Sequence, residues 1–120
     1  MDTYRQKGID MDEERVVLCA ANAYTKKYYL NDDFSLLPQR VQDELQIMCV
    51  LYTEEIGGVL SLYFDEAGNL NFETSKKDDD FFFDEIGSGL KIRQMQREKE
   101  ELLESLELFY KTFFTEGVED

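Results

Sequence analysis

The 120-residue sequence contains no histidine, and this absence removes several kinds of chemistry. Histidine is the usual general base near neutral pH, the commonest metal ligand, and the group that activates a serine or cysteine nucleophile. Two cysteines cannot complete a tetrahedral zinc site of nitrogen and sulfur ligands. The residues that a histidine-free enzyme could use are Asp84, Glu85, Cys19, Lys27 and Tyr28. Their spacing pairs no acid with a base, so we expect no catalytic residue and no cofactor.

Cysteine and positive charge are also scarce. Cys19 and Cys49 lie in apolar runs, which predicts two reduced, buried thiols in a cytoplasmic protein. Thirteen basic residues against 27 acidic ones give a net charge of −14, which disfavours nucleic acid and anionic lipid as partners. No apolar run approaches the ~20 residues of a membrane span, and the first residues lack the apolar core of a secretory signal.

What the sequence does contain is enough apolar material for one core, since 42% of its residues are hydrophobic. A single proline and seven glycines argue against disorder. We predict a polar tail over residues 1–14, one domain over residues 15–116, and a short acidic tail over residues 117–120.

The first segment of the domain, residues 15–30, has two interpretations. Val17, Ala21, Tyr24 and Tyr28 recur at helical spacing. Residues 16–18 and 28–30 are nevertheless rich in strand-forming side chains, and the residues between them can turn. The pattern favours a β-hairpin, with a helix as the alternative.

A helix is predicted next, from Pro38 to the pair Gly57-Gly58, because proline is tolerated in the first helical turn and glycine ends helices. Its apolar stripe consists of Val41, Leu45, Met48 and Tyr52. Further apolar residues, which are Ile47, Val50 and Leu51, predict that the second half of this helix is buried on more than one side.

A second hairpin and a long helix complete the domain. Apolar residues alternate over residues 59–64 and 70–74, and the link DEAGN between them supplies a turn. Residues 90–115 predict one helix that crosses the whole domain. Its stripe is Ile92, Met95, Lys99, Leu102, Leu106, Phe109 and Phe113, with Lys99 as the polar interruption. The element order β-β-α-β-β-α indicates an α+β fold, in which a small antiparallel sheet packs against two helices.

The stretch SKKDDDFFFDEIGSGLKIR, residues 75–93, could be a metal loop, a phosphate loop or a junction between two elements. The spacing fails as an EF-hand, because Phe83 stands where the loop needs glycine. The residues that could still hold a divalent ion weakly are Asp78, Asp80, Asp84 and Glu85. A phosphate site would use the glycines ahead of a helix start, although the P-loop frame is absent.

The favoured interpretation of this stretch is a junction. It would begin with a solvated acidic turn and continue with an apolar anchor, in which Phe81 and Phe83 face one side of a short strand and Phe82 the other. Asp84 and Glu85 would then begin the last helix, where acids complement the helix dipole.

Three segments of the sequence carry a resemblance to a known family. They are VVLCAANAYTKKYYLN, LPQRVQDELQIMCVLYTEEIGGVL and DEIGSGLKIRQMQREKEELLESLELFYKTFF. Together they resemble domain of unknown function 6145, a family of short proteins from clostridial-type bacteria, over roughly residues 15–114. The resemblance implies a cytoplasmic bacterial protein and carries over no site residue, because the family has no assigned activity.

These observations favour a non-enzymatic protein-interaction module or adaptor. The last helix carries apolar residues on two faces, so we expect a homodimer contact through Leu103, Tyr110 and Phe114. The alternative is a regulator that binds a small ligand or a divalent metal through residues 78–85. A histidine-free enzyme is the third hypothesis.

Overall fold

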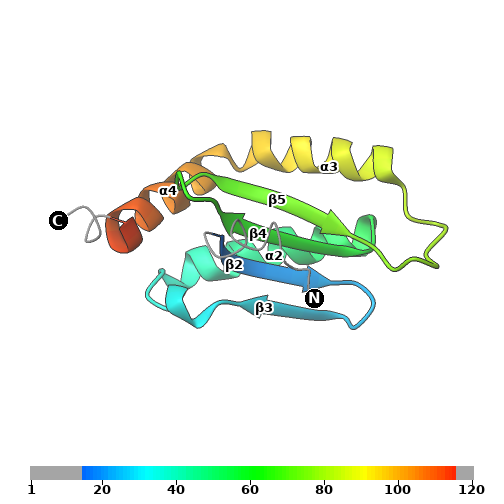
Figure 1. The fold of residues 1–120 in the computed structure, drawn as a ribbon, viewed down its shortest axis with the longest axis horizontal. Coiled ribbons are helices and arrows are strands. Elements are labelled where there is room, and N and C mark those ends of the chain that lie inside the picture. The colour runs from blue at the N-terminus through cyan, green and yellow to red at the C-terminus, as the bar shows by residue number, and fades with distance from the viewer. Residues whose placement is uncertain (1–14, 116–120) are drawn as a thin grey trace, which may run out of the picture.

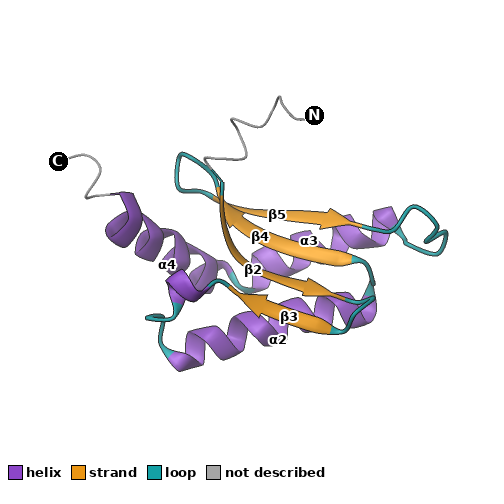
Figure 2. Cartoon of the chain, turned by 60° about the horizontal axis from the view of Figure 1, so that its bottom comes forward, coloured by secondary structure: helices purple, strands orange, loops and turns teal. Residues whose placement is uncertain are grey.

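The computed structural model describes residues 15–115, which form one antiparallel sheet with helices packed on one of its faces (Figures 1 and 2). The strand order is β3-β2-β4-β5. The elements in chain order are β2 (Val16–Asn22), β3 (Lys27–Leu30), a 3-10 turn (Asp32–Phe34), α2 (Gln39–Glu55), β4 (Val59–Phe64), β5 (Leu70–Ser75), α3 (Glu85–Glu98), α4 (Glu100–Tyr110) and a π-helical turn (Lys111–Thr115). The predicted α+β class and antiparallel sheet are confirmed.

The first hairpin, β2–β3, is confirmed, and the helical alternative for this segment is wrong. Its register pairs Cys19 with Leu30 and Asn22 with Lys27. The Asn22 carboxamide oxygen accepts hydrogen bonds from the backbone N–H groups of Tyr24, at 2.8 Å, and Thr25, at 3.2 Å, which stabilises the turn. The segment forms a strand despite its helical spacing because β2 pairs with β3 on one side and with β4 on the other.

The second hairpin, β4–β5, also forms as predicted. Leu60, Leu62 and Phe64 alternate along β4 and are completely buried beneath the helices. The carboxylate of Asp65 accepts from two backbone N–H groups of the turn, and Gly68 takes a positive φ of 85°. An irregularity in the β2–β4 register, between Val17 and Cys19, is accompanied by the burial of two consecutive side chains, Leu18 and Cys19.

Helix α2 begins just after Pro38 and buries three residues of its predicted stripe, with Val41 partly buried, but it is not buried on a second side. Ile47 and Leu51 remain 59% and 53% exposed, so that expectation is wrong. The helices form a single layer, and the outer side of α2 has no further layer against which to pack (Figure 2). Cys49 and Thr53 are buried instead, and the Cys49 sulfur lies against that of Cys19 in β2.

The C-terminal segment is broken into two helices, and the prediction of one long helix is wrong. Helix α3 starts at Glu85, and the break falls at Lys99, whose φ and ψ of −111° and 25° are not helical. The bend has a packing reason. It allows α3 to lie along α2, where the Tyr52 and Ser88 hydroxyls share a buried 2.7 Å hydrogen bond, while α4 turns to cover the end of the sheet.

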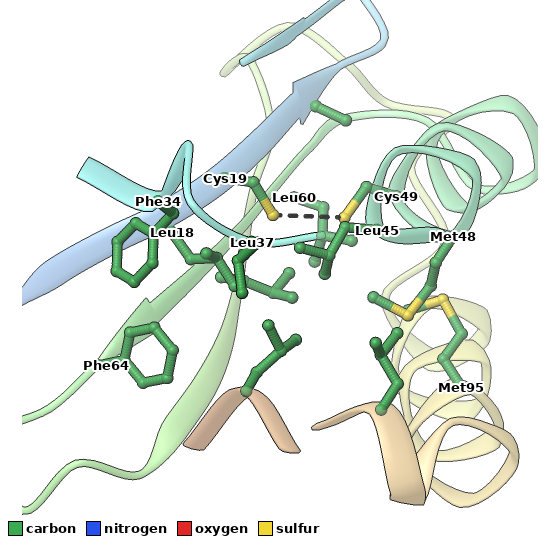
Figure 3. Packing of buried hydrophobic residues seen from close by; sticks show 14 of the residues in the cluster. Leu18, Cys19, Phe34, Leu37, Leu45, Met48, Cys49, Leu60, Phe64 and Met95 are labelled. Carbon is green, nitrogen blue, oxygen red and sulfur yellow. Dashed lines mark hydrogen bonds between the residues drawn. The ribbon is translucent and has the colours of Figure 1, made fainter. Parts of the chain in front are cut away.

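The core is a single cluster that includes side chains from the sheet and from all three of these helices (Figure 3). Aromatic rings close it beneath α4. Tyr110 stacks on Phe64 at 4.2 Å between ring centroids, and Phe114 stacks on Phe34 at 4.7 Å. Phe113, predicted to lie on the inner stripe, is 66% exposed. The π-helical turn is wider than an α-helical one, so the inward position moves from residue 113 to residue 114.

Candidate functional site

The acidic stretch forms a loop between β5 and α3 that projects from one end of the molecule in both views (Figures 1 and 2). We call residues 76–84 the phenylalanine loop. The interpretation of this stretch as a junction is confirmed. Asp84 caps α3, because its carboxylate accepts a 2.9 Å hydrogen bond from the backbone N–H of Gly87.

Two of the three phenylalanines in the loop point into solvent. Phe81 is 86% exposed and Phe82 is 96% exposed. Of the three, only Phe83 packs against the fold, and it lies so close to Gly58 that a Cβ there would be 2.7 Å from the Phe83 ring. The predicted strand with Phe81 and Phe83 on one side is therefore wrong. Residues 81–82 lie in a turn instead, and no helix or strand among residues 15–115 covers their rings.

The loop is held in place by Tyr24, in the turn of the first hairpin. The Tyr24 hydroxyl donates to a carboxylate oxygen of Asp80 at 2.5 Å and accepts from the backbone N–H of Lys77 at 3.2 Å. The ammonium group of Lys77 also lies 4.8 Å from the centroid of the Tyr24 ring. The second Asp80 oxygen accepts from the backbone N–H of Phe82. The exposed rings are thus carried by a loop of defined shape.

These hydrogen bonds alter the acidity of both partners. The hydrogen bond from Tyr24 lowers the pKa of Asp80 below its usual 3.8, with smaller contributions from the backbone N–H groups of Phe82 and Phe83 and from Lys76. The same contact raises the pKa of Tyr24, because the ionised phenol could not donate to Asp80. At neutral pH the pair therefore consists of a carboxylate and a neutral phenol.

The phosphate-loop alternative is wrong, since α3 begins at Glu85 and the glycines lie inside its first turns rather than ahead of it. The metal hypothesis stays a prediction. The candidates are Asp78, Asp80, Asp84 and Glu85. Of these, Asp80 already accepts a hydrogen bond from Tyr24, and Asp84 caps α3. Within residues 15–115, no group of three or more acidic or cysteine side chains is arranged to hold a metal ion.

The residues predicted to form a dimer contact all pack against the chain's own core. Tyr110 is only 7% exposed, and Phe114 stacks on it at 5.0 Å between ring centroids. Leu103 is partly buried against the same cluster. A contact between two copies stays a prediction, and the large apolar side chains that α4 and the π-helical turn leave exposed are Leu108 and Phe113.

The two cysteines are buried, as predicted, and their sulfur atoms lie 3.9 Å apart between β2 and α2 (Figure 3). The hydrogen bond with Cys19, together with burial, raises the pKa of the Cys49 thiol well above its usual value. Because the thiolate is the reactive form of cysteine, this arrangement suits packing rather than nucleophilic catalysis. Burial likewise raises the pKa of Tyr28, whose hydroxyl lies within the fold.

Two hollows were not foreseen from the sequence. One, of about 580 Å³, lies between the first hairpin turn and α2 and includes Lys26, Lys27 and Glu54 in its lining. The other, of about 540 Å³, lies where α2 meets the α3–α4 bend, and Lys99 there forms a 3.2 Å ion pair with Glu44. Both are assembled from segments distant in sequence, so no local motif marks them.

Comparisons with known proteins give one match. No curated protein and no solved structure resembles the chain closely enough to count as a match. In the described part of the chain, none of the helices combines the length and the apolar character needed to traverse a bilayer. A family profile covers residues 15–118, which is nearly the whole chain and agrees with the resemblance noted from the sequence. The chain belongs to this family, DUF6145, a family of unknown function.

Proposed function

We propose that the protein is a non-enzymatic interaction module of the bacterial cytoplasm that binds another protein through the phenylalanine loop. One observation carries the proposal: Phe81 and Phe82 are almost completely exposed on a loop that hydrogen bonds hold in one shape. Adjacent exposed aromatic rings are costly in water and typical of contact sites.

The free energy gained by burying the two rings is large enough for a contact site. Burying a phenylalanine side chain contributes about 1.5–3 kcal/mol, so two such rings contribute about 3–6 kcal/mol. A micromolar complex requires about 8 kcal/mol in total, after the loss of rotational and translational freedom. The two rings therefore supply a large share of such an affinity. Because the loop is already ordered, less entropy is lost when it binds.

Affinity capture from extracts of the producing cells tests the proposal. The full-length protein and the double variant Phe81→Ser, Phe82→Ser would be used as baits, and the bound proteins compared by quantitative mass spectrometry. We expect at least one protein to be captured by the wild type and lost with the double variant. A matched control is Leu36→Ser, which removes an 82% exposed apolar side chain elsewhere on the surface.

The double variant should fold normally, because both rings are solvated in the wild type. Circular dichroism and thermal unfolding would establish this. The proposal is contradicted if wild type and double variant capture the same proteins in the same amounts.

A further inference from the structure

We infer that the partner of the phenylalanine loop presents an apolar pocket with a basic rim. This inference rests on the proposed function and adds the chemistry of the partner. Its basis is the placement of charge around Phe81 and Phe82. Four exposed acidic residues lie within four positions of these rings along the chain, and they are Asp78, Asp79, Asp84 and Glu85.

The acidic side chains have no cationic partner within the described part of the chain. The ion pairs there join Arg15 to Glu73, Lys91 to Glu55, and Lys99 to Glu44. Two basic residues precede the acids: Lys77 directs its ammonium group over the Tyr24 ring, and Lys76 forms none of these ion pairs. The negative charge of Asp78, Asp79 and Glu85 is therefore available to a partner, while the Asp84 carboxylate also caps α3.

This negative charge indicates which kind of partner can bind the phenylalanine loop. A membrane with anionic lipids would repel the loop, since the whole chain also carries a net charge of −14. A second copy of the chain would bring the same charge and be repelled as well. A protein pocket that buries the two rings and surrounds them with lysine or arginine satisfies both the apolar and the charged parts of the loop.

A basic rim has a kinetic consequence that an uncharged pocket would not have. Complementary charges at the rim of an interface raise the rate of association, and added salt screens them. Neutralising Asp78 and Asp79 should therefore slow association while leaving the phenylalanine rings in place. Both carboxylates are exposed and engaged in no hydrogen bond or ion pair among residues 15–115, so their replacement should not disturb the fold.

The experiment begins with identification of the partner. A photoreactive benzoyl-phenylalanine is placed at Phe82 of the full-length protein in the producing cells, and the cross-linked species is identified by mass spectrometry. The cross-linked protein is then purified and used as the probe. Its association with wild type is compared with that of Asp78→Asn, Asp79→Asn at 50 and 500 mM salt. The control is Asp32→Asn, Asp33→Asn, an adjacent exposed acidic pair elsewhere on the surface.

We expect the Asp78, Asp79 variant to associate about tenfold more slowly at low salt, the control to match wild type, and the difference to disappear at high salt. Equal rates for wild type and the Asp78, Asp79 variant would overturn the basic rim. A cross-link to lipid or to a second copy of the chain would also overturn it. If Phe81→Ser, Phe82→Ser abolishes binding of the same probe while charge has no effect, the proposed function stands and only this inference fails.

Discussion

At the scale of single residues, the Tyr24 hydroxyl connects parts of the chain that are far apart in sequence. It donates a hydrogen bond to Asp80 and accepts one from the Lys77 backbone N–H, so one oxygen binds two residues of the phenylalanine loop. A hydroxyl can fill both roles at once, whereas a phenylalanine could fill neither. The shape of the exposed loop thus depends on a side chain in the first hairpin.

The acidity of Asp80 should report this connection. A carboxyl group whose pKa is lower in the folded than in the unfolded protein stabilises the fold above its usual value, here 3.8, and loses that contribution as the pH falls through the lowered folded value. We expect Tyr24→Phe to return the Asp80 pKa toward 3.8. NMR titration of the Asp80 carboxyl carbon measures this change.

A control for the titration exists in the same molecule. The pKa of Asp65 is lowered chiefly by its hydrogen bond from Asn71, in the other hairpin. Its titration should therefore be the same in wild type and in Tyr24→Phe. Identical Asp80 titrations in the two proteins would show that Tyr24 does not hold the loop.

At the scale of elements, the end of α4 decides which aromatic rings enter the core. The π-helical turn places Phe114 on Phe34 and leaves its neighbour Phe113 exposed. Adjacent residues of the same type therefore have different surroundings, which makes them a matched pair for mutation.

We predict that Phe114→Asp destabilises the protein by about 3 kcal/mol or more, because it removes stacked aromatic contacts and brings a charge against the core. Phe113→Asp should change stability by no more than about 1 kcal/mol, since its ring is mostly solvated. Urea unfolding at several protein concentrations measures both. Equal effects would contradict the assignment of Phe114 to the core. A folded Phe114→Asp protein that no longer self-associates would instead support the predicted dimer contact.

The elements that could be predicted are those with local signals. The second hairpin shows period-two alternation and a turn, the first has strand-forming side chains on both sides of residues that can turn, and α2 has a proline at its start and glycines at its end. The break at Lys99 could not be placed, because apolar residues continue at helical spacing on both sides of it. Only the polar residue itself marked the position, and a lysine is acceptable within a helix.

The exposed rings of the candidate site were missed for a related reason. Three consecutive phenylalanines indicate a buried segment, and the local sequence does not say which of them is buried. That choice is made by Gly58, whose missing side chain leaves space for the ring of Phe83. The exposure of Ile47 and Leu51 is equally non-local, since it depends on whether a further layer covers α2.

At the scale of the whole molecule, one core joins the sheet to the helices, and the two thiols lie within it. Cys19 comes from β2, at the centre of the sheet, and Cys49 from α2. Neither sulfur can reach solvent unless the sheet and helix layers separate. The reactivity of the thiols should therefore measure the opening of the entire domain.

We predict that an aromatic disulfide reagent modifies Cys19 and Cys49 at the same slow rate at pH 8. Both side chains are 0% exposed, and their hydrogen bond and burial keep the Cys49 thiol protonated. If the free energy of unfolding is about 5 kcal/mol, the low end for small domains, modification should be slower than that of an exposed thiol by a factor of about 10³ or more. Leu36→Cys supplies the exposed thiol within the same protein, since Leu36 is 82% exposed.

The dependence of this rate on urea distinguishes global from local opening. If the layers must separate completely, the logarithm of the rate should rise with urea along the slope found for equilibrium unfolding, because the same surface is exposed in both processes. A shallower slope, or different rates for the two cysteines, would show that β2 or α2 opens separately. Such a result would mean that the sheet and the helix layer are not one cooperative unit, despite the single core they share.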